Sequence, residues 1–420
     1  MWGNLCVGFF YLISIGTTMK NFRLASLGAV AIIAFQPFTL SYAAPANSVA
    51  EMLSEGDTSL SFRYRYEFVD QDGVGKDANA STLKSRLTYK SAAYQGLTAT
   101  MEVDNVTIIG DENYRTPTNG NAGYPIVADP DGTDFNQATL SYKADDIVAT
   151  FGRQRILHGG QRFVGGVGFR QNEQTYDALT LSSKAVGPVS IDYSYIWNVN
   201  RIFGPKDSAV QAKRWESDSH IAYASFSPAK GQSVKGYAYL LDFANAAANS
   251  SSTYGIEYSG KFDGFALTAA YATQSDYADN PTSYDADYLM AEVTFPLKPI
   301  SVALGYEVLG SDKGTAAFKT PLATLHKFQG WADKFLGTPA NGVEDSYLKL
   351  AGKLGPAKVA LFYHDFSADY GGADLGSEFD VVATYPIKKG LSVQLKYASY
   401  DADSHASDTE KLWFTISAKY

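Results

Sequence analysis

Apolar and polar side chains alternate with a period of two over most of the chain. Between Leu60 and Phe68, large apolar residues take every second position, and Ser, Arg and Glu fill the positions between them. This spacing is typical of a β-strand with one apolar and one polar face, because successive side chains point to opposite sides. One such strand would also suit a soluble sheet, but the repetition predicts many strands that share one apolar surface. The pattern recurs at residues 83–90, 189–197, 254–258, 265–271, 300–306 and 391–397.

Short and long connections alternate between these strands. Very short links occur near residues 94–96, 144–146, 187–188, 263–264, 298–299, 355–356 and 388–390. Longer polar links separate them, at residues 70–80, 110–133, 157–173, 201–216, 244–252, 275–285, 311–344, 368–377 and 401–408. Nine long links imply about eighteen strands, an even number as in single-chain bacterial barrels, which have short periplasmic turns and longer extracellular loops. We therefore predict an all-β fold, a transmembrane antiparallel up-and-down β-barrel over residues 58–420. Residues 174–186 and 217–227 alternate poorly, so their strand registers are left unassigned.

The first 43 residues are interpreted as a leader with a signal peptide. Met19 opens a short basic segment, an apolar run follows, and the small residues Ser41 and Ala43 lie where signal peptidase needs them. We predict that translation starts at Met19 and that cleavage follows Ala43; a longer leader with a tandem apolar segment is the alternative. Residues 44–57 then form a periplasmic N-terminal segment, with one or two helical turns at 49–53. After Ala43 no run reaches the ~20 apolar residues of a transmembrane helix, so we expect an exported chain without a helical anchor.

Composition and charge narrow the classes of function. The chain has 420 residues, 19% of them charged, and a formal net charge of −9. Loss of Lys20 and Arg23 with the leader takes that charge to −11 (−9 minus 2), and an acidic chain is a poor match for nucleic acid. The one cysteine, Cys6, lies in the leader, which excludes disulfides and thiolate metal sites from the mature chain. We expect no cofactor and no metal.

The last segment of the chain ends on an aromatic residue in phase with the apolar face. That ending is similar to the C-terminal signature by which outer-membrane barrels in general are assembled. We therefore expect an integral protein of the Gram-negative outer membrane that contacts lipids and lipopolysaccharide, uses the barrel assembly machinery and is a monomer. The alternating apolar residues are Leu412, Phe414, Ile416, Ala418 and Tyr420.

Closure of the barrel would divide the charged inward positions between two walls. Because the last strand of a barrel pairs with the first, both ends of the chain contribute to one basic pore-lining wall. Its residues are Arg63, Arg65, Lys84, Arg86, Lys349, Lys396 and Lys411. The middle strands contribute an acidic pore-lining wall of Asp192, Asp242, Glu257, Glu292 and Glu307. Such a field selects solutes by charge, and the arginine fork favours carboxylate or phosphate. The alternative is that these charges only pair with one another and with water.

The long link at residues 311–344 has a pattern of its own. Thr320 and Pro321 suit the start of a helix, and apolar residues follow at helical spacing, from Leu322 to Phe335. We predict a helix that forms a constriction or a lid over the pore; the alternative is a helix packed on the extracellular rim. The residues of this element that would meet a solute are His326, Lys327, Trp331 and Lys334.

Catalytic patterns are weak in this sequence. Some outer-membrane barrels are hydrolases, but here the histidines are scattered, and Ser219 and His220 are adjacent on a strand, where neighbours face opposite ways. The chain has no P-loop and no HExxH motif. We predict that the protein is not an enzyme. A barrel hydrolase is kept as the alternative of another class, and it would lose activity on replacement of Ser219 or His220.

Several strings resemble the alginate export family of outer-membrane porins, in particular its porin-like members. They are the FRYRYE run at residues 62–67, FGRQR at 151–155, RQNEQTYDA at 170–178 and TPLATLH at 320–326. The resemblance covers nearly the whole mature chain and implies an eighteen-stranded channel. The family takes its name from a member that exports an anionic polymer through an arginine-lined pore, whereas lysine supplies much of the basic wall here. We predict a porin for passive diffusion of small anionic solutes or oligosaccharides, with alginate-like polysaccharide export as the alternative.

Overall fold

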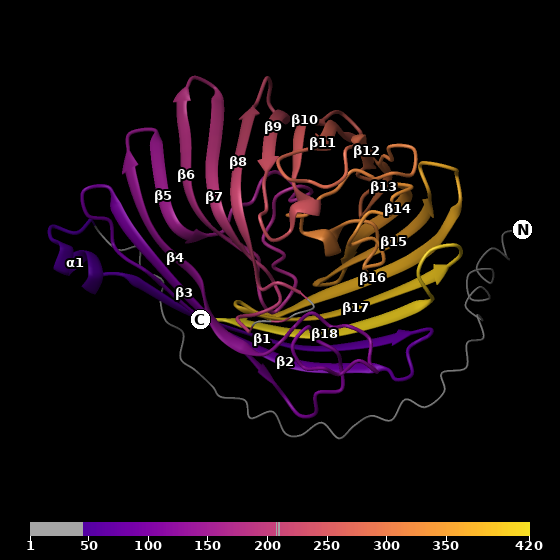
Figure 1. Cartoon of the computed structure of the whole chain (residues 1–420). Coiled ribbons are helices and arrows are strands. Elements are labelled where there is room, and N and C mark those ends of the chain that lie inside the picture. Colours follow the sequence, from indigo (N-terminus) through magenta and orange to yellow (C-terminus); the bar gives the residue numbers. More distant parts are fainter. Residues whose placement is uncertain (1–44, 207, 209–210) are drawn as a thin grey trace, which may run out of the picture. The chain divides into compact units, whose positions relative to one another are not determined.

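Eighteen strands form one antiparallel sheet in the computed structural model, which describes residues 45–206, 208 and 211–420 (Figure 1). The predicted leader and its cleavage site lie outside these residues. The strands are β1 (Asp57–Gln71), β2 (Ala78–Lys90), β3 (Leu97–Ile108), β4 (Gly132–Ala144), β5 (Ile147–Gln154), β6 (Thr175–Val186), β7 (Val189–Asn200), β8 (Arg214–Phe226), β9 (Gln232–Leu241), β10 (Ser251–Lys261), β11 (Ala266–Asp276), β12 (Asp285–Phe295), β13 (Ile300–Leu309), β14 (Val343–Leu354), β15 (Ala357–Ser367), β16 (Asp374–Lys388), β17 (Leu391–Ala402) and β18 (Thr409–Lys419).

The sheet closes on itself. Each strand pairs with its neighbours in sequence, and β1 pairs with both β2 and β18. At the seam Arg63 lies opposite Ser417 on one side and Lys84 on the other, so the two ends of the chain share one wall. The backbone N–H of Tyr420 donates to the Leu60 carbonyl at 2.8 Å, which completes the seam at its end. The predicted eighteen-stranded up-and-down barrel is confirmed.

The outer face of the barrel is apolar, as the alternation predicted. On β12, Leu289 is 47% exposed while its neighbour Tyr288 is 1% exposed. Leu304 on β13 and Leu395 on β17 are more than half exposed and share the outward parity. Exposure of so much apolar surface to water would be unfavourable, so these side chains are expected to face lipid. Among the residues described, no helix is both long and apolar enough to span a bilayer.

Two β-bulges explain the segments whose alternation was unclear. The pairing of β6 with β7 shifts between Ser183 and Val186, with the extra residue on β6, and the pairing of β7 with β8 shifts between Ile196 and Asn198, with the extra residue on β8. A bulge adds one residue to one strand and reverses the facing of the residues beyond it, so period two breaks locally. The short helix expected in the N-terminal segment is present as α1 (Val49–Ser54), capped by the Ser48 hydroxyl.

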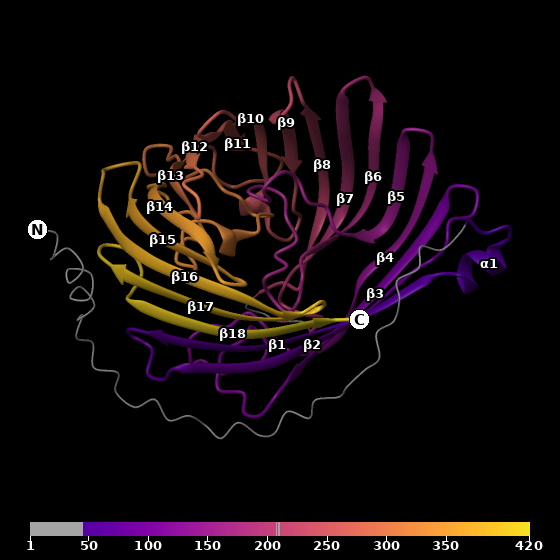
Figure 2. The ribbon, with the colours of Figure 1, turned by 180° about the vertical axis from the view of Figure 1, so that it is seen from behind.

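The long connections lie at one end of the barrel, and two of them fold into it. In Figures 1 and 2 the loops after β5 and after β13 lie within the ring of strands. We call residues 155–174 the β5–β6 loop and residues 310–342 the β13–β14 loop. The two loops meet inside the lumen, where Val164 and Leu322 form a parallel bridge and the Gly165 N–H donates to the Leu322 carbonyl at 2.8 Å.

The prediction of a helix in the β13–β14 loop is wrong. The loop contains only one 3₁₀ turn, at Leu325–Lys327. Gln329, Gly330 and Asp333 have φ values of 49°, 76° and 62°, and a right-handed helix cannot continue through that left-handed region. The apolar spacing arises because side chains such as Leu322 pack into the filled lumen, not because the backbone repeats every 3.6 residues.

Candidate functional site

A cavity of about 630 Å³ opens at the short-turn end of the barrel. It is lined by β1, β2 and β18, by the turn between β16 and β17, and by Glu173 of the β5–β6 loop. Three of the cavity's lysines and arginines belong to the predicted basic wall. In the described part of the chain, its charged lining residues are Arg63, Lys84, Arg86, Lys388, Lys389 and Lys419, against Glu173 as the single acid. This end of the lumen is therefore strongly basic.

Two arginines of β1 hold the backbone of the β5–β6 loop. Arg63 donates to the Gly168 carbonyl at 2.7 Å and to Gln171 Oε1 at 2.9 Å. Arg65 lies one step deeper and donates to the Phe169 carbonyl at 2.6 Å. The hydrogen bonds of Arg63 go to neutral oxygens, so it fixes the loop and still contributes its positive charge to the cavity.

The Glu173 carboxylate lies between three cations. Its Oε1 is 2.8 Å from Arg86 Nη2 and 3.7 Å from Lys84 Nζ, and its Oε2 is 2.5 Å from Arg155 Nε. Burial alone would raise the pKa of this carboxyl, but the three cations hold it well below its usual range. Arg86 and Arg155 also contact Glu102 on β3. An ion-pair cluster thus bounds the cavity on the side of the β5–β6 loop.

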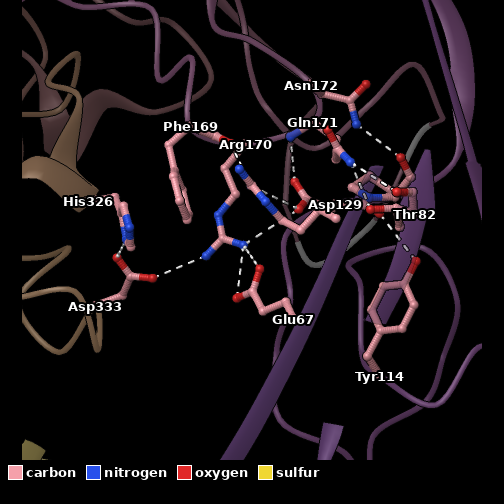
Figure 3. A network of polar contacts seen from close by, with 12 residues as sticks. Glu67, Thr82, Tyr114, Asp129, Phe169, Arg170, Gln171, Asn172, His326 and Asp333 are labelled. Carbon is pink, nitrogen blue, oxygen red and sulfur yellow. Dashed lines mark hydrogen bonds and ion pairs between the residues drawn. The ribbon is translucent and has the colours of Figure 1, made fainter. Parts of the chain in front are cut away.

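Arg170 joins both infolded loops to the wall, as Figure 3 shows. Its Nη1 donates to the two Glu67 oxygens at 3.2 and 2.9 Å, and its Nη2 donates to Asp333 Oδ2 at 3.1 Å. Asp333 also accepts from Lys411 Nζ at 2.9 Å. Glu67 has no exposed surface, and the side chain of Arg170 is only 7% exposed. Buried charge pairs therefore fix the centres of both loops against β1 and β18.

Lys396 of β17 lies among aromatic rings and beside an imidazole. Its Nζ is 3.7 Å from the Trp331 centroid, 4.7 Å from the Phe169 centroid and 2.5 Å from His326 Nε2. Burial lowers the pKa of His326 well below its ordinary value. The neutral ring can accept from Lys396 through Nε2 while it donates through Nδ1 to Asp333, 2.7 Å away. The remaining predicted basic residue, Lys349, faces the Phe362 ring at 5.2 Å.

Four of the five predicted acidic-wall residues point into the barrel, where each has a partner. Glu307 accepts from Arg162 Nε at 2.6 Å, and Glu257 pairs with a lysine of β9 at 2.5 Å. Asp192 and Glu292 accept hydroxyl hydrogen bonds at 2.5 and 2.8 Å. The pairing alternative therefore holds for Glu307 and Glu257, whose partners are cations, whereas the hydroxyls beside Asp192 and Glu292 are neutral and leave the charge of these acids in place.

The placement of Asp242 on that acidic wall is wrong. Tyr239 and Leu241 of β9 are buried on the inner side, so the next residue along the strand direction faces the other way. Asp242 lies just beyond the end of β9, and its charged neighbours are Asp218 and Asp279. The sequence did not show which face of β9 is the inner one, because Tyr239, Leu240 and Leu241 are all apolar.

The predicted constriction residues all lie in the β13–β14 loop, which the wall holds from inside. The backbone N–H groups of Trp331 and Ala332 donate to Glu378 Oε1 on β16. Lys327 reaches across to the β5–β6 loop and donates to the Gly160 carbonyl at 2.8 Å. Lys334 lies on the far side of the loop, 5.9 Å from the ring of a tyrosine of β17. The loop therefore narrows the lumen as an infolded segment without an α-helix.

Comparison with protein families gives a match over almost the whole described chain. The model of a family described as Gram-negative porin matches residues 28–420. The chain belongs to the Gram-negative porin family. It is an integral outer-membrane channel protein and not an enzyme, and the match does not extend to the alginate export family that the sequence strings resemble. No curated protein matches the sequence.

Solved structures support the porin fold independently. Acinetobacter baumannii OccAB4 superposes with a TM-score of 0.67 at 15% identity, over 88% of this chain and 99% of that one. Pseudomonas aeruginosa OccK3 (OpdO) gives 0.68 at 12% identity, over 89% and 97%. P. aeruginosa OpdK, solved with vanillate, gives 0.66 at 14% identity, over 88% and 99%. The TM-scores show that the fold is shared. Identities this low carry no information about the solute of this porin.

The loop residues that form ion pairs with the wall of this porin were not predicted from the sequence. Glu173, Arg170 and Arg162 carry the main ion pairs to the wall, and none was among the candidate site residues. One signal was available, because the polar run at 170–178 directly precedes a strand and was singled out only for its resemblance. A run of polar side chains at such a position can also fold inward and satisfy buried charges on the wall.

Proposed function

We propose that this porin passes small carboxylate-bearing solutes through the outer membrane by passive diffusion. The observation that carries the proposal is the cavity at the periplasmic end, whose charged lining is basic except for Glu173. A solute that reaches this end of the lumen meets fixed positive charge inside walls of low dielectric, where the potential is concentrated. Anions are then enriched in the pathway and cations are depleted.

The two sides of the lumen contribute unequally to this field. Arg63 gives its hydrogen bonds to neutral oxygens, and Lys396 faces rings and a neutral imidazole. Glu307 and Glu257, on the opposite side, each have a cation within hydrogen-bond distance. Among the described residues, Asp192 and Glu292 accept only from neutral hydroxyls. On the basic side, Lys84, Arg86 and Lys411 are paired with carboxylates, whereas Arg63, Lys349 and Lys396 have no ion-pair partner in the described chain. The basic side therefore keeps three uncompensated charges and the acidic side two. This asymmetry favours anionic over cationic solutes.

Arginine supports carboxylate as the preferred anionic group, because its planar fork matches two oxygens at once. The P. aeruginosa channel OpdK was solved with vanillate, which is a carboxylate, and its barrel superposes on this one. That finding concerns OpdK, but it makes vanillate a reasonable first probe here.

Liposome swelling tests the proposal directly. We expect vesicles that contain the porin to swell faster in vanillate than in a cation of similar size, such as arginine methyl ester, and protein-free vesicles to show neither rate. Equal rates for the two solutes, or faster entry of the cation, would contradict the charge preference. No swelling in any solute would contradict the channel itself.

Export of an alginate-like anionic polysaccharide is the second candidate. The same basic side supports it, since a polyuronate carries one carboxylate per sugar, but the infolded loops leave a cavity of only about 630 Å³. We expect short uronate oligomers to reduce the ion current only briefly; long-lived block by chains of many sugars would favour export. The expectations of a monomer, of lipopolysaccharide contact and of assembly by the barrel machinery stay predictions.

A further inference from the structure

The surroundings of Glu173 have the composition of a carboxylate-binding site. Three cationic side chains surround its two oxygens, and Asn136 Nδ2 adds a hydrogen bond to Oε2 at 3.1 Å. The Glu173 side chain is 8% exposed, so little water competes for these donors. A free carboxylate of a solute would need the same donors: a guanidinium fork, a second cation and an amide.

Glu173 also lines two separate spaces. It borders the large basic cavity, and it borders a pocket of about 30 Å³ on the other side, next to Asp104 and Arg153. The second space is about large enough for a single water molecule. Displacement of the Glu173 side chain would therefore open the boundary that the two spaces share at this residue.

We propose that Lys84, Arg86 and Arg155 form a binding site for the carboxylate group of a permeating solute, and that Glu173 occupies this site as an internal substitute when no solute is present. Entry of a solute then displaces Glu173 and opens the path beside the β5–β6 loop. This inference rests on the proposed function, because it names the place where the proposed solute class binds. The porin thus carries its own competitor for the anion.

The wall acids of the cluster are not equivalent to Glu173. Arg86 keeps a bidentate contact with Asp104, at 2.6 Å for each oxygen, and Arg155 keeps Glu102 when Glu173 leaves. Lys84 has only Glu173 as a carboxylate partner in the described chain. Departure of Glu173 therefore leaves Lys84 without a carboxylate partner and frees one N–H donor edge on Arg86 and one on Arg155. A solute carboxylate can then bind to these donors.

The backbone on both sides of Glu173 is anchored independently of its carboxylate. Gln171 donates to the Thr82 hydroxyl at 2.9 Å, and Gln174 donates to the Gly165 carbonyl at 3.1 Å. Both glutamines are buried. A substitution at Glu173 is therefore expected to change the charge of the site while the β5–β6 loop stays in place.

The test compares the variants Glu173→Gln and Glu112→Gln with the unmodified porin in planar bilayers, with vanillate as the probe. Glu112 lies in the β3–β4 loop, where it accepts from Asn119 at 3.0 Å, and it lines neither cavity, so this variant makes the same charge change elsewhere. An internal competitor multiplies the apparent affinity for the solute by the fraction of time that the site is free. If Glu173 holds the site about nine-tenths of the time, Glu173→Gln should lower the vanillate concentration for half-block by about tenfold.

Each outcome decides the matter in one direction. A lower half-block concentration in Glu173→Gln alone supports the substitute role, and an unchanged or higher concentration refutes it. An equal change in Glu112→Gln also refutes it, since net charge alone would then explain the effect. If the unmodified porin carries current but shows no preference for anions, the proposed function fails instead, and that result is visible before any variant is made.

Discussion

Replacement of Arg170 by methionine should release the infolded loops from the barrel wall. Arg170 is the described partner that donates to Glu67, which is fully buried, and it shares Asp333 with Lys411. Asp333 keeps a cation in the variant, but Glu67 is left as a buried charge without one. Loss of one partner of a buried ion pair costs about 3–5 kcal/mol. We expect the variant to lose that amount in the free energy of unfolding.

The measurement is urea unfolding in lipid vesicles, combined with single-channel recording. In the recordings, the loosened loops should give larger and noisier currents. Arg153→Met is the control, because the pair of Arg153 with Asp177 is about one-fifth exposed at the end of β5, so water reaches the stranded carboxylate and the loss should be smaller than that of Arg170→Met. The double variant Glu67→Gln with Arg170→Met should recover part of the loss, since no charge is then stranded. A loss for Arg170→Met no larger than that of Arg153→Met would refute the role of this pair.

Three further predictions concern other parts of the barrel. Leu304→Arg puts a charge on the lipid face and should cost about 2–4 kcal/mol of unfolding free energy in vesicles; an unchanged value would mean that Leu304 does not face lipid. Gly330→Ala should disturb the β13–β14 loop and the current, because φ is 76° and an added Cβ would overlap the Glu378 carboxylate. Gly73→Ala, with φ of 83° and open space around it, measures the backbone strain alone and should leave the current unchanged. Burial, with the nearby charge of Lys411, lowers the pKa of Lys334 to about 8, so anion preference should fall as pH rises through that value. This fall in anion preference should be absent from the variant Lys334→Met. A fall of equal size in that variant would mean that another group titrates.

The barrel could be predicted from the sequence because its physics is local. A strand between lipid and water must alternate, and residues such as Leu304 and Leu395 show this without any knowledge of their partners. Alternation is lost where apolar residues are adjacent, as at residues 239–241, and Asp242 was therefore assigned to the wrong side. The turn between β8 and β9 was not predicted either.

The interior of the lumen could not be predicted in the same way. Glu173 meets Lys84 and Arg86 only because a long loop folds back between the walls, and no periodicity marks that path. The apolar residues of the β13–β14 loop pack in the lumen at a spacing that resembles a helix, while Gln329 and Gly330 turn the backbone out of helical geometry. The alternation along a strand thus shows which wall residues point inward. The loop residues that contact them depend on tertiary structure.

The reversal potential in a KCl gradient shows whether the porin prefers chloride or potassium. We infer that the basic side of the lumen, with Arg63, Lys84 and Arg86 at its periplasmic end, sets this preference. We expect a potential with the sign of chloride preference, which moves toward zero when these three residues are replaced by glutamine. A potential with the sign of potassium preference in the unmodified porin would contradict it, and so would a chloride preference that the triple replacement leaves unchanged.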